Sequence, residues 1–198
     1  GFLGEGPPDL AAETDGEIVD YEVAVVDEEG RRLPQGAEGE ICARGPALFL
    51  GYADPAQTAE SFDAEGCFHT GDMGRVTAQN AVVITGRKKD LINRGGEKIS
   101  AREVEDLLHA HPAVQEAAVV AMPHPRLGET VCAYVIPKPG VRVALDELLQ
   151  VAQAAGVARQ KSPERLVLVE DLPRTPSGKV RKDLLREDIR RRLKDGRG

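Results

Sequence analysis

Short runs of Val and Ile, separated by turn residues, dominate the first part of the chain. Residues 17–26 (EIVDYEVAVV) are rich in β-branched residues with partial alternation, which is typical of a strand. The stretches DEEG and LPQGAEGE that follow contain Gly and acidic residues, which predict turns, and the Gly- and Pro-rich residues 1–16 predict a loop. The remaining elements predicted for this β-rich unit are strands at residues 41–44, 68–70 and 82–85 and one helical turn at residues 58–62.

Helical periodicity begins after about residue 87. Ser100 and Glu103 match a capping box, in which the two side chains satisfy exposed N–H groups at a helix start. Val104, Leu107 and Leu108 then share one face, until His-Pro at 111–112 ends the helix. The later elements predicted are strands at residues 117–121, 131–136 and 165–169 and helices at residues 145–152 and 181–193.

This order of elements predicts an α+β fold, with helices packed on a small sheet. We place the boundary near Lys88 and Lys89. Residues 1–87 would form the β-rich unit and residues 88–198 the α+β domain.

The charge composition of the chain argues against one class of function, nucleic-acid binding. A net charge of −7 over 198 residues argues against non-specific binding to nucleic acid. Basic residues nevertheless gather near the C-terminus, where Glu187 and Asp188 are interleaved with them. We interpret this segment as a solvated helix face in preference to a functional patch. The basic residues are Arg181, Lys182, Arg186, Arg190, Arg191, Arg192 and Lys194.

The cysteines and apolar runs predict a cytoplasmic protein. Cys42, Cys67 and Cys132 lie far apart, with neither metal-ligand spacing nor a disulfide framework, which suits a reducing compartment. No apolar run approaches the roughly 20 residues of a membrane span, and no secretory signal is visible. Because the chain opens at Gly1 without Met, we expect it to be a fragment of a longer protein.

Three polar stretches containing Gly are candidates for chemistry, and FHTGD (68–72) is the first. Gly71 lets the backbone turn after a strand, and Asp72 then presents a carboxylate at the strand end. One carboxylate can accept hydrogen bonds from both hydroxyls of a ribose. Thr-Gly-Asp is also a common turn, and alone the motif favours that simpler interpretation.

The second stretch is GRKKDLINRGGEKIS (86–100), which we predict to be a loop between a strand and the capped helix. Gly95 and Gly96 permit positive φ or close approach of a ligand to the backbone. Arg87 offers planar donors suited to sugar hydroxyls or phosphate. A mobile surface connection with solvated charges explains the stretch equally well.

The third stretch is LPRTPSGKVRKDLLR (172–186). A Pro-Ser-Gly turn places Lys179 at a loop tip just before a helix. Such a cation can swing into an anionic site and neutralise charge that develops during nucleotidyl transfer. An exposed lysine near a helix start is the alternative interpretation.

Taken together, in this order and spacing, the motifs resemble the adenylate-forming superfamily of acyl-CoA synthetases, adenylation domains and luciferases. The resemblance includes GEICARGPALFLGY (39–52), HPAV (111–114) and LGE (127–129), and it covers nearly the whole chain. It implies the end of a large N-terminal domain followed by a mobile α+β C-terminal domain.

The resemblance implies a role for each motif in the use of ATP. Asp72 would accept hydrogen bonds from the ribose of ATP or AMP, and Arg87 would contact the same ribose. Lys179 would bridge the carboxylate and the α-phosphate while the acyl-adenylate forms. Lys89 would be the hinge about which the C-terminal domain rotates.

The second half-reaction, in which the CoA thiol attacks the acyl carbon, would use another loop. Gly95 and Gly96 would line the pantetheine tunnel, and Lys98 would lie near the phosphates of CoA. Rotation at the hinge would exchange this loop with the one that carries Lys179. The partners implied are ATP, CoA and a small carboxylic acid, with Mg²⁺ bound to ATP and held mainly by the missing N-terminal part.

Two departures from the family pattern qualify the resemblance. Asn93 stands where many relatives have a phosphate-binding Lys, although Arg94 could compensate. The Ser/Thr/Gly-rich phosphate loop and the aromatic-Gly-x-Thr-Glu stretch of relatives are absent, as is most of the acyl pocket. We therefore predict that these 198 residues alone cannot complete adenylation.

The sequence is compatible with three functions. The GRKKDLINRGGEKIS stretch is closer to fatty, aryl and alicyclic acyl-CoA ligases than to amino-acid adenylation domains, which favours a CoA ligase. The alternatives are an adenylation enzyme that loads a carrier protein and a non-catalytic interaction module. The presence of Asp72, Arg87 and Lys179 argues against the last. We assign no metal ligand and expect the four histidines to be structural.

Overall fold

The computed structural model describes residues 14–46, 48 and 51–196. It divides into two compact units between Lys89 and Asp90, each with its own sheet. The loop expected at residues 1–16 lies almost entirely outside the described residues. Residues 47, 49 and 50 of the 39–52 motif also lie outside them.

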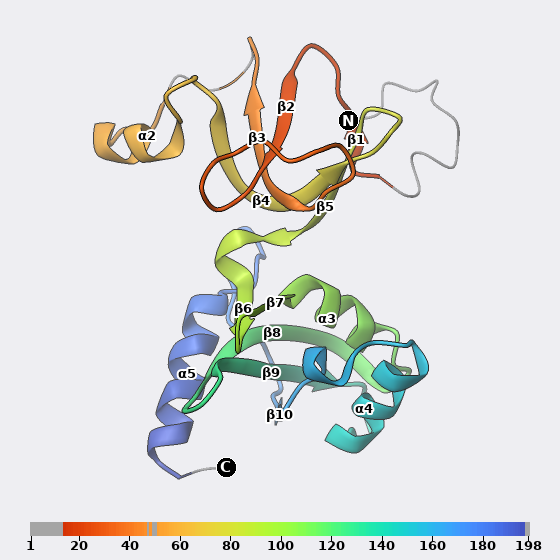
Figure 1. The fold of residues 1–198 in the computed structure, drawn as a ribbon. Coiled ribbons are helices and arrows are strands. Elements are labelled where there is room, and N and C mark those ends of the chain that lie inside the picture. The colour runs from red at the N-terminus through yellow and green to blue at the C-terminus, as the bar shows by residue number, and fades with distance from the viewer. Residues whose placement is uncertain (1–13, 47, 49–50, 197–198) are drawn as a thin grey trace. The chain divides into compact units, whose positions relative to one another are not determined.

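The first unit contains an antiparallel sheet with the strand order β1-β5-β4-β3-β2 (Figure 1). The single strand predicted at residues 17–26 is wrong, because it is interrupted between β1 and β2. Asp20 has a φ of 58°, which an extended strand cannot contain. The elements are β1 (Gly16–Glu17), β2 (Glu22–Val26), β3 (Gly39–Arg44), α2 (Pro55–Ser61), β4 (Phe68–Val76) and β5 (Ala81–Arg87).

The second unit has the predicted α+β architecture. In its sheet, β9 pairs with β8 and β6 in antiparallel fashion and with β10 in parallel, and β7 pairs with β6. A 3-10 turn at Lys88–Asp90 (η1) spans the boundary between the units. The strands of the second unit are β6 (Leu91–Arg94), β7 (Glu97–Ser100), β8 (Val114–His124), β9 (Gly128–Pro137) and β10 (Arg165–Leu168). Its helices are α3 (Ala101–His109), α4 (Leu145–Ala154) and α5 (Lys182–Lys194), with a 3-10 turn (η2) at Arg159–Lys161.

The prediction of a continuous loop at residues 86–100 is wrong, because most of this stretch is the β6–β7 hairpin. Ile92 and Ile99 lie opposite each other in the register, and both are fully buried. Their burial stabilises the hairpin, while the intervening Asn93, Arg94 and Lys98 made the sequence look like a loop. The lone isoleucines show no strand periodicity without the partner strand.

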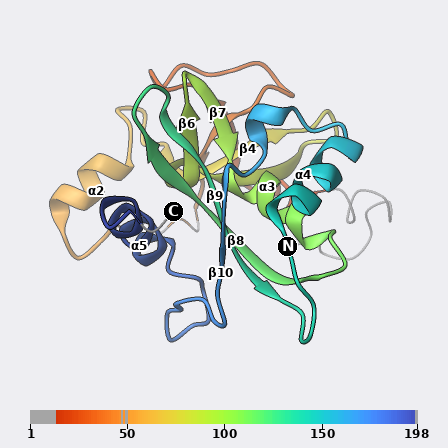
Figure 2. The ribbon, with the colours of Figure 1, turned by 90° about the horizontal axis from the view of Figure 1, so that it is seen from below.

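Helices cover both faces of the second sheet (Figure 2). Along β8, Ala117 and Val119 face a core built with α3 and α4. The alternate residues Ala118 and Val120 face the core under α5. This two-sided burial explains why the strand is apolar at consecutive positions instead of alternating.

The helix α3 begins as predicted at Ser100. Its hydroxyl accepts a hydrogen bond from the backbone N–H of Glu103, with an N–O distance of 3.4 Å. The carboxylate of Glu103 is bound by Lys161 at 3.1 Å from both oxygens. The cap therefore combines a local hydrogen bond with an ion pair to η2.

The helix α5 departs in part from the predicted solvated face. Leu185 and Ile189 are buried against the sheet, and three of its basic residues are half-buried in ion pairs. Lys182 and Arg186 pair with Asp90, and Arg192 pairs with Asp188 on the preceding turn. Within the described residues, no helix is both long and apolar enough to cross a membrane.

Candidate functional site

Asp72 and Arg87 are register partners on the adjacent antiparallel strands β4 and β5. The Arg87 Nη1 donates to Asp72 Oδ1 at 2.7 Å and to the backbone oxygen of Thr70 at 3.1 Å. The prediction that Asp72 follows a strand end is wrong, because β4 continues through it to Val76. Tertiary pairing with β3 and β5 extends the strand beyond what the local sequence indicates.

Backbone geometry at Thr70 and Gly71 fixes the direction of the Asp72 side chain. Gly71 has a φ of +71°, a left-handed conformation that favours glycine. The Thr70 hydroxyl donates to the backbone oxygen of Ile41 at 2.7 Å and accepts from the N–H of Asp72 at 3.0 Å. The carboxylate is therefore held by a bent strand segment whose polar groups are already engaged.

A buried carboxylate beside this segment was missed at the level of sequence. The side chain of Glu40 on β3 is only 6% exposed, and it accepts from Lys88 Nζ at 2.8 Å and contacts His69 Nδ1 at 3.1 Å. It also accepts from the N–H of Gly71 at 3.3 Å. Burial alone would raise the pKa of Glu40, but the hydrogen bonds and charges of Lys88 and His69 outweigh it and lower the pKa.

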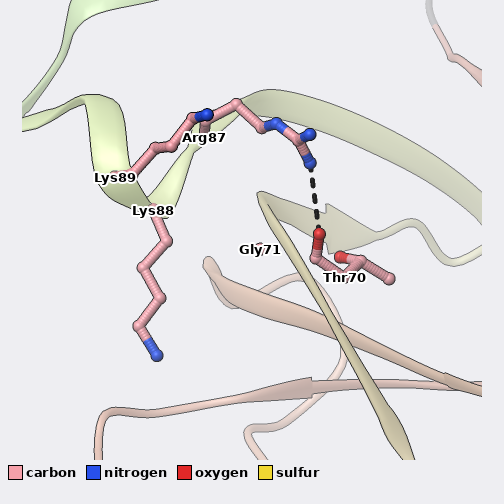
Figure 3. A pocket seen from close by; sticks show the side chains of 5 residues that line it. All are labelled: Thr70, Gly71, Arg87, Lys88 and Lys89. Carbon is pink, nitrogen blue, oxygen red and sulfur yellow. Dashed lines mark hydrogen bonds between the residues drawn. The ribbon is translucent and has the colours of Figure 1, made fainter. Parts of the chain in front are cut away.

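A cavity of about 380 Å³ lies against these residues. Its lining consists of Thr70, Gly71, Arg87, Lys88 and Lys89, as Figure 3 shows. Arg87 reaches over β4 towards Thr70, whereas the Lys88 side chain leaves the ribbon in a different direction. With three cationic residues in its lining, the cavity suits an anionic ligand that also carries hydroxyl groups.

In the second unit, Gly95 and Gly96 form the turn of the β6–β7 hairpin. Their φ values are +60° and +94°, which favour glycine at both positions. The N–H of Gly95 donates to the backbone oxygen of Leu127 at 2.8 Å, and that of Gly96 donates to Asn93 Oδ1 at 3.1 Å. The turn is thus fixed to the loop that follows β8.

Asn93 and Arg94 have structural partners in this hairpin. Asn93 is the register partner of Lys98, and its amide oxygen holds the turn. The Arg94 Nε binds Glu164 at 2.8 Å, and its side chain is only 24% exposed. Arg94 is the residue that could compensate for the absent phosphate-binding lysine at position 93, and in this structure it is paired with Glu164.

The loop that carries Lys179 is a tight hairpin between β10 and α5. Arg174 and Val180 form an isolated bridge, and the N–H of Thr175 donates to the backbone oxygen of Lys179 at 2.8 Å. Gly178, with a φ of +85°, closes the turn. Lys179 itself is exposed just before α5, as predicted.

These two loops are anchored at opposite ends of β8. Arg174, at the base of the Lys179 hairpin, binds Glu116 near the start of β8 at 2.5 Å from each carboxylate oxygen. Gly95 is bound to Leu127, which follows the end of β8 at His124. At about 3.3 Å per residue, the part of β8 from Glu116 to His124 is roughly 25 Å long.

The histidines take structural roles. His109 Nε2 accepts a hydrogen bond from the backbone N–H of Ala117 at 3.2 Å. His111 Nδ1 accepts one from the backbone N–H of Ala113, also at 3.2 Å. His124 accepts from the N–H of Leu127 at 3.2 Å. His69 contacts Glu40, so it supports the buried carboxylate beside the Thr70–Asp72 segment.

Comparison with protein families finds two matches, in separate parts of the chain. Residues 103–179 match the model described as AMP-binding enzyme C-terminal domain. Residues 6–53 match the model described as AMP-binding enzyme. The second match begins in residues that the structure does not describe.

Among the proteins similar to this chain, two curated relatives are named as enzymes that act on a carboxylic acid, and one solved structure is named as ATP-bound. A medium-chain fatty-acid–CoA ligase of Escherichia coli is 51% identical over 87% of this chain and 31% of its own length. A salicylyl-CoA synthase / salicylate adenylyltransferase of a Streptomyces species is 42% identical over 94% of this chain and 34% of its own. The ATP-bound crystal structure of MatB from Rhodopseudomonas palustris matches with a TM-score of 0.82 at 36% identity, covering 89% of this chain and 35% of that one. The chain therefore spans about a third of the length of these proteins.

Proposed function

The chain belongs to the AMP-binding enzyme family, and we propose that it is the C-terminal part of an acyl-CoA ligase. The whole enzyme would activate a carboxylic acid with ATP to an acyl-adenylate and pass the acyl group to the thiol of CoA. The observation that carries this proposal is the Asp72–Arg87 pair beside a cation-lined cavity.

In the first half-reaction, Asp72 would bind the ribose of ATP. Its Oδ1 is engaged by Arg87, while among the described residues no hydrogen bond engages Oδ2, which can accept from a ribose hydroxyl. Arg87 fixes the carboxylate and offers further guanidinium donors to the same sugar. Lys179, exposed on a short hairpin, would neutralise charge on the α-phosphate as the acid attacks it.

In the second half-reaction, the Gly95–Gly96 turn would approach the pantetheine arm of CoA. A turn without β-carbons lets a narrow chain pass close to the backbone. Lys98, next to this turn on β7, would bind a phosphate of CoA. Because this turn and the Lys179 hairpin lie at opposite ends of β8, a rotation at Lys89 would be needed to exchange them.

We assign no Mg²⁺ ligand to this chain. The residues lining the cavity are cationic or uncharged, so they suit the ribose and phosphates and do not suit a metal ion. Mg²⁺ would arrive bound to ATP, held by the N-terminal part that this chain lacks.

A second candidate is an adenylation enzyme that loads a carrier protein. It is favoured by the similarity to the enzyme named both salicylyl-CoA synthase and salicylate adenylyltransferase. The two functions share the first half-reaction and differ in the acceptor, so the identity of the accepted thiol distinguishes them.

Thioester formation by the full-length protein tests the proposal. ATP and CoA would be supplied with a panel of fatty, aryl and alicyclic acids, for the wild type and for Lys179→Ala. We expect an acyl-CoA product that falls by about a hundredfold in the variant, as when one charge-stabilising group is removed. Lys138→Ala is the control, because Lys138 is an exposed lysine at the end of β9. Formation of acyl-AMP without any acyl-CoA would instead favour the carrier-loading enzyme.

A further inference from the structure

The first unit brings together two thiols and a carboxylate that the sequence keeps apart. Cys42 lies on β3, Cys67 directly precedes β4, and Asp63 follows α2. One ligand atom from each, the two sulfurs and a carboxylate oxygen, lie within 4.8 Å of one another. This cluster is separate from the residues that line the cavity beside Arg87.

The backbone holds these ligands in place. The N–H of Asp63 donates to the backbone oxygen of Cys67 at 3.0 Å, and the N–H of Gly66 donates to that of Asp63 at 3.1 Å. Asp63 Oδ1 in turn accepts from the N–H groups of Glu65 and Cys67 at 2.9 and 2.8 Å. The residues 63–67 therefore form a closed turn with a defined position against β3.

The three ligand atoms of the cluster belong to side chains that are buried or half-buried. Cys42 is fully buried, Cys67 is 6% exposed, and Asp63 is half-buried. Two thiols and a carboxylate, all of them anions when deprotonated, thus converge in a largely buried setting, and a bound metal ion would compensate their charge.

We propose that Cys42, Asp63 and Cys67 form a binding site for a borderline-soft divalent cation, with Zn²⁺ as the expected occupant. Thiolate and carboxylate ligands together suit Zn²⁺ better than Mg²⁺ or Ca²⁺, which prefer oxygen alone. With three protein ligands, one tetrahedral position remains for water or another small ligand.

The geometry requires only a small contraction. Sulfur ligands about 2.3 Å from zinc lie about 3.8 Å from each other in a tetrahedron, so the three atoms would draw in by no more than about 1 Å. The half-buried Asp63 gives the ion a route from solvent. Binding would release the thiol protons, so affinity would rise with pH.

The expected role of the ion is structural. The buried core around the thiols contains Val26, Cys42 and Cys67. Phe62 and Phe68 are the sequence neighbours of Asp63 and Cys67, and their rings pack with planes tilted by 50° and centroids 5.3 Å apart. A metal ion would clamp the turn at residues 63–67 to β3. It would thereby fix the start of β4, which leads into the Thr70–Asp72 segment.

Metal titration of the full-length protein tests the site. The protein would be stripped with a chelator, kept reduced, and titrated with Zn²⁺ in competition with a chromophoric chelator, and separately with Co²⁺. We expect one equivalent of Zn²⁺ that raises the melting temperature, and thiolate-to-cobalt absorption with Co²⁺. Both responses should be lost in Cys42→Ser and in Cys67→Ser.

Two further variants separate ligation from folding. Asp63→Asn keeps the oxygen that accepts the turn hydrogen bonds but removes the charge, and should weaken Zn²⁺ binding by about tenfold or more. Cys132→Ser is the control, because Cys132 is equally buried but lies in the second unit. The proposal is overturned if the protein binds no Zn²⁺, if binding survives in Cys42→Ser, or if Cys42 and Cys67 form a disulfide that excludes metal.

Discussion

Arg186 on α5 binds Asp90, the first residue of the second unit, with a nitrogen–oxygen distance of 2.5 Å. The Asp90 side chain is only 14% exposed, and Lys182 approaches it at 3.9 Å. Asp90 is therefore anchored to its own unit. A rotation of that unit, as the proposed function requires, would have to use the backbone bonds of Lys88 and Lys89.

Replacement of Asp90 by Ala should lower the free energy of unfolding by about 2 kcal/mol, because the half-buried Arg186 and Lys182 would each lose one ion-pair partner. Chemical denaturation monitored by circular dichroism measures this. Asp106→Ala is the control, since Asp106 is exposed and its nearest contact with Arg102 is 3.9 Å long. Equal losses in the two variants would contradict the anchoring role of Asp90.

Replacement of Asp72 by Asn should weaken ATP binding by the full-length enzyme about tenfold or more, since a charged acceptor for ribose contributes about 1.5–3 kcal/mol. Isothermal titration with a non-hydrolysable ATP analogue would measure the affinity. Arg75→Ala provides the comparison, because Arg75 lies on the same strand β4 but is exposed. Unchanged affinity in Asp72→Asn would refute the ribose-binding role.

The buried Glu40 should make stability depend on acid pH. Its folded pKa lies below the ordinary value of 4.5, so its contribution is present at neutral pH and is lost as pH falls through the folded pKa. The difference in melting temperature between wild type and Glu40→Gln should thus be largest near neutral pH and shrink below about pH 4.5. Glu60→Gln, at an exposed position on α2, should show no such trend. A difference that stays constant from pH 7 to pH 3 would count against the ionised, paired Glu40.

A comparison of substitutions at Gly96 and Gly140 distinguishes the effect of backbone strain from an effect on acyl transfer. Both have positive φ, at +94° and +76°, and a β-carbon at either would meet nothing within 4 Å. Gly96→Ala and Gly140→Ala should each cost about 1 kcal/mol of stability. Only Gly96→Ala should slow acyl transfer to CoA, while acyl-AMP formation is retained in both. Equal transfer rates in the two variants would remove the turn from the proposed CoA tunnel.

The 198-residue chain by itself should make no acyl-AMP, since it contains neither the phosphate loop nor most of the acyl pocket of its relatives. Incubation with ATP and the acid accepted by the full-length enzyme, followed by mass spectrometry, tests this. The full-length protein in the same assay is the positive control. Acyl-AMP above the level of a sample without protein would show that the chain holds a complete site.

Local sequence determined most of the helices and the α+β class. The capping residue Ser100 and the spaced apolar residues of α3 and α5 specify these helices, because their signals lie within a few positions of each other. The motif residues Asp72, Arg87 and Lys179 were also visible as candidates from residue type and turn chemistry. Their roles in binding and catalysis remain predictions.

Tertiary structure decided what depends on residues far apart in the chain. The β6–β7 hairpin exists because Ile92 and Ile99 are buried in one core with residues of α3, β8 and β9, and the local pattern does not show these contacts. Glu40 contacts Lys88 and His69 only when β3, β4 and β5 are paired. The same pairing brings the sulfur of Cys42 close to that of Cys67. Sequence patterns report periodic burial along one element, whereas a charge network or a ligand cluster depends on which strands become neighbours.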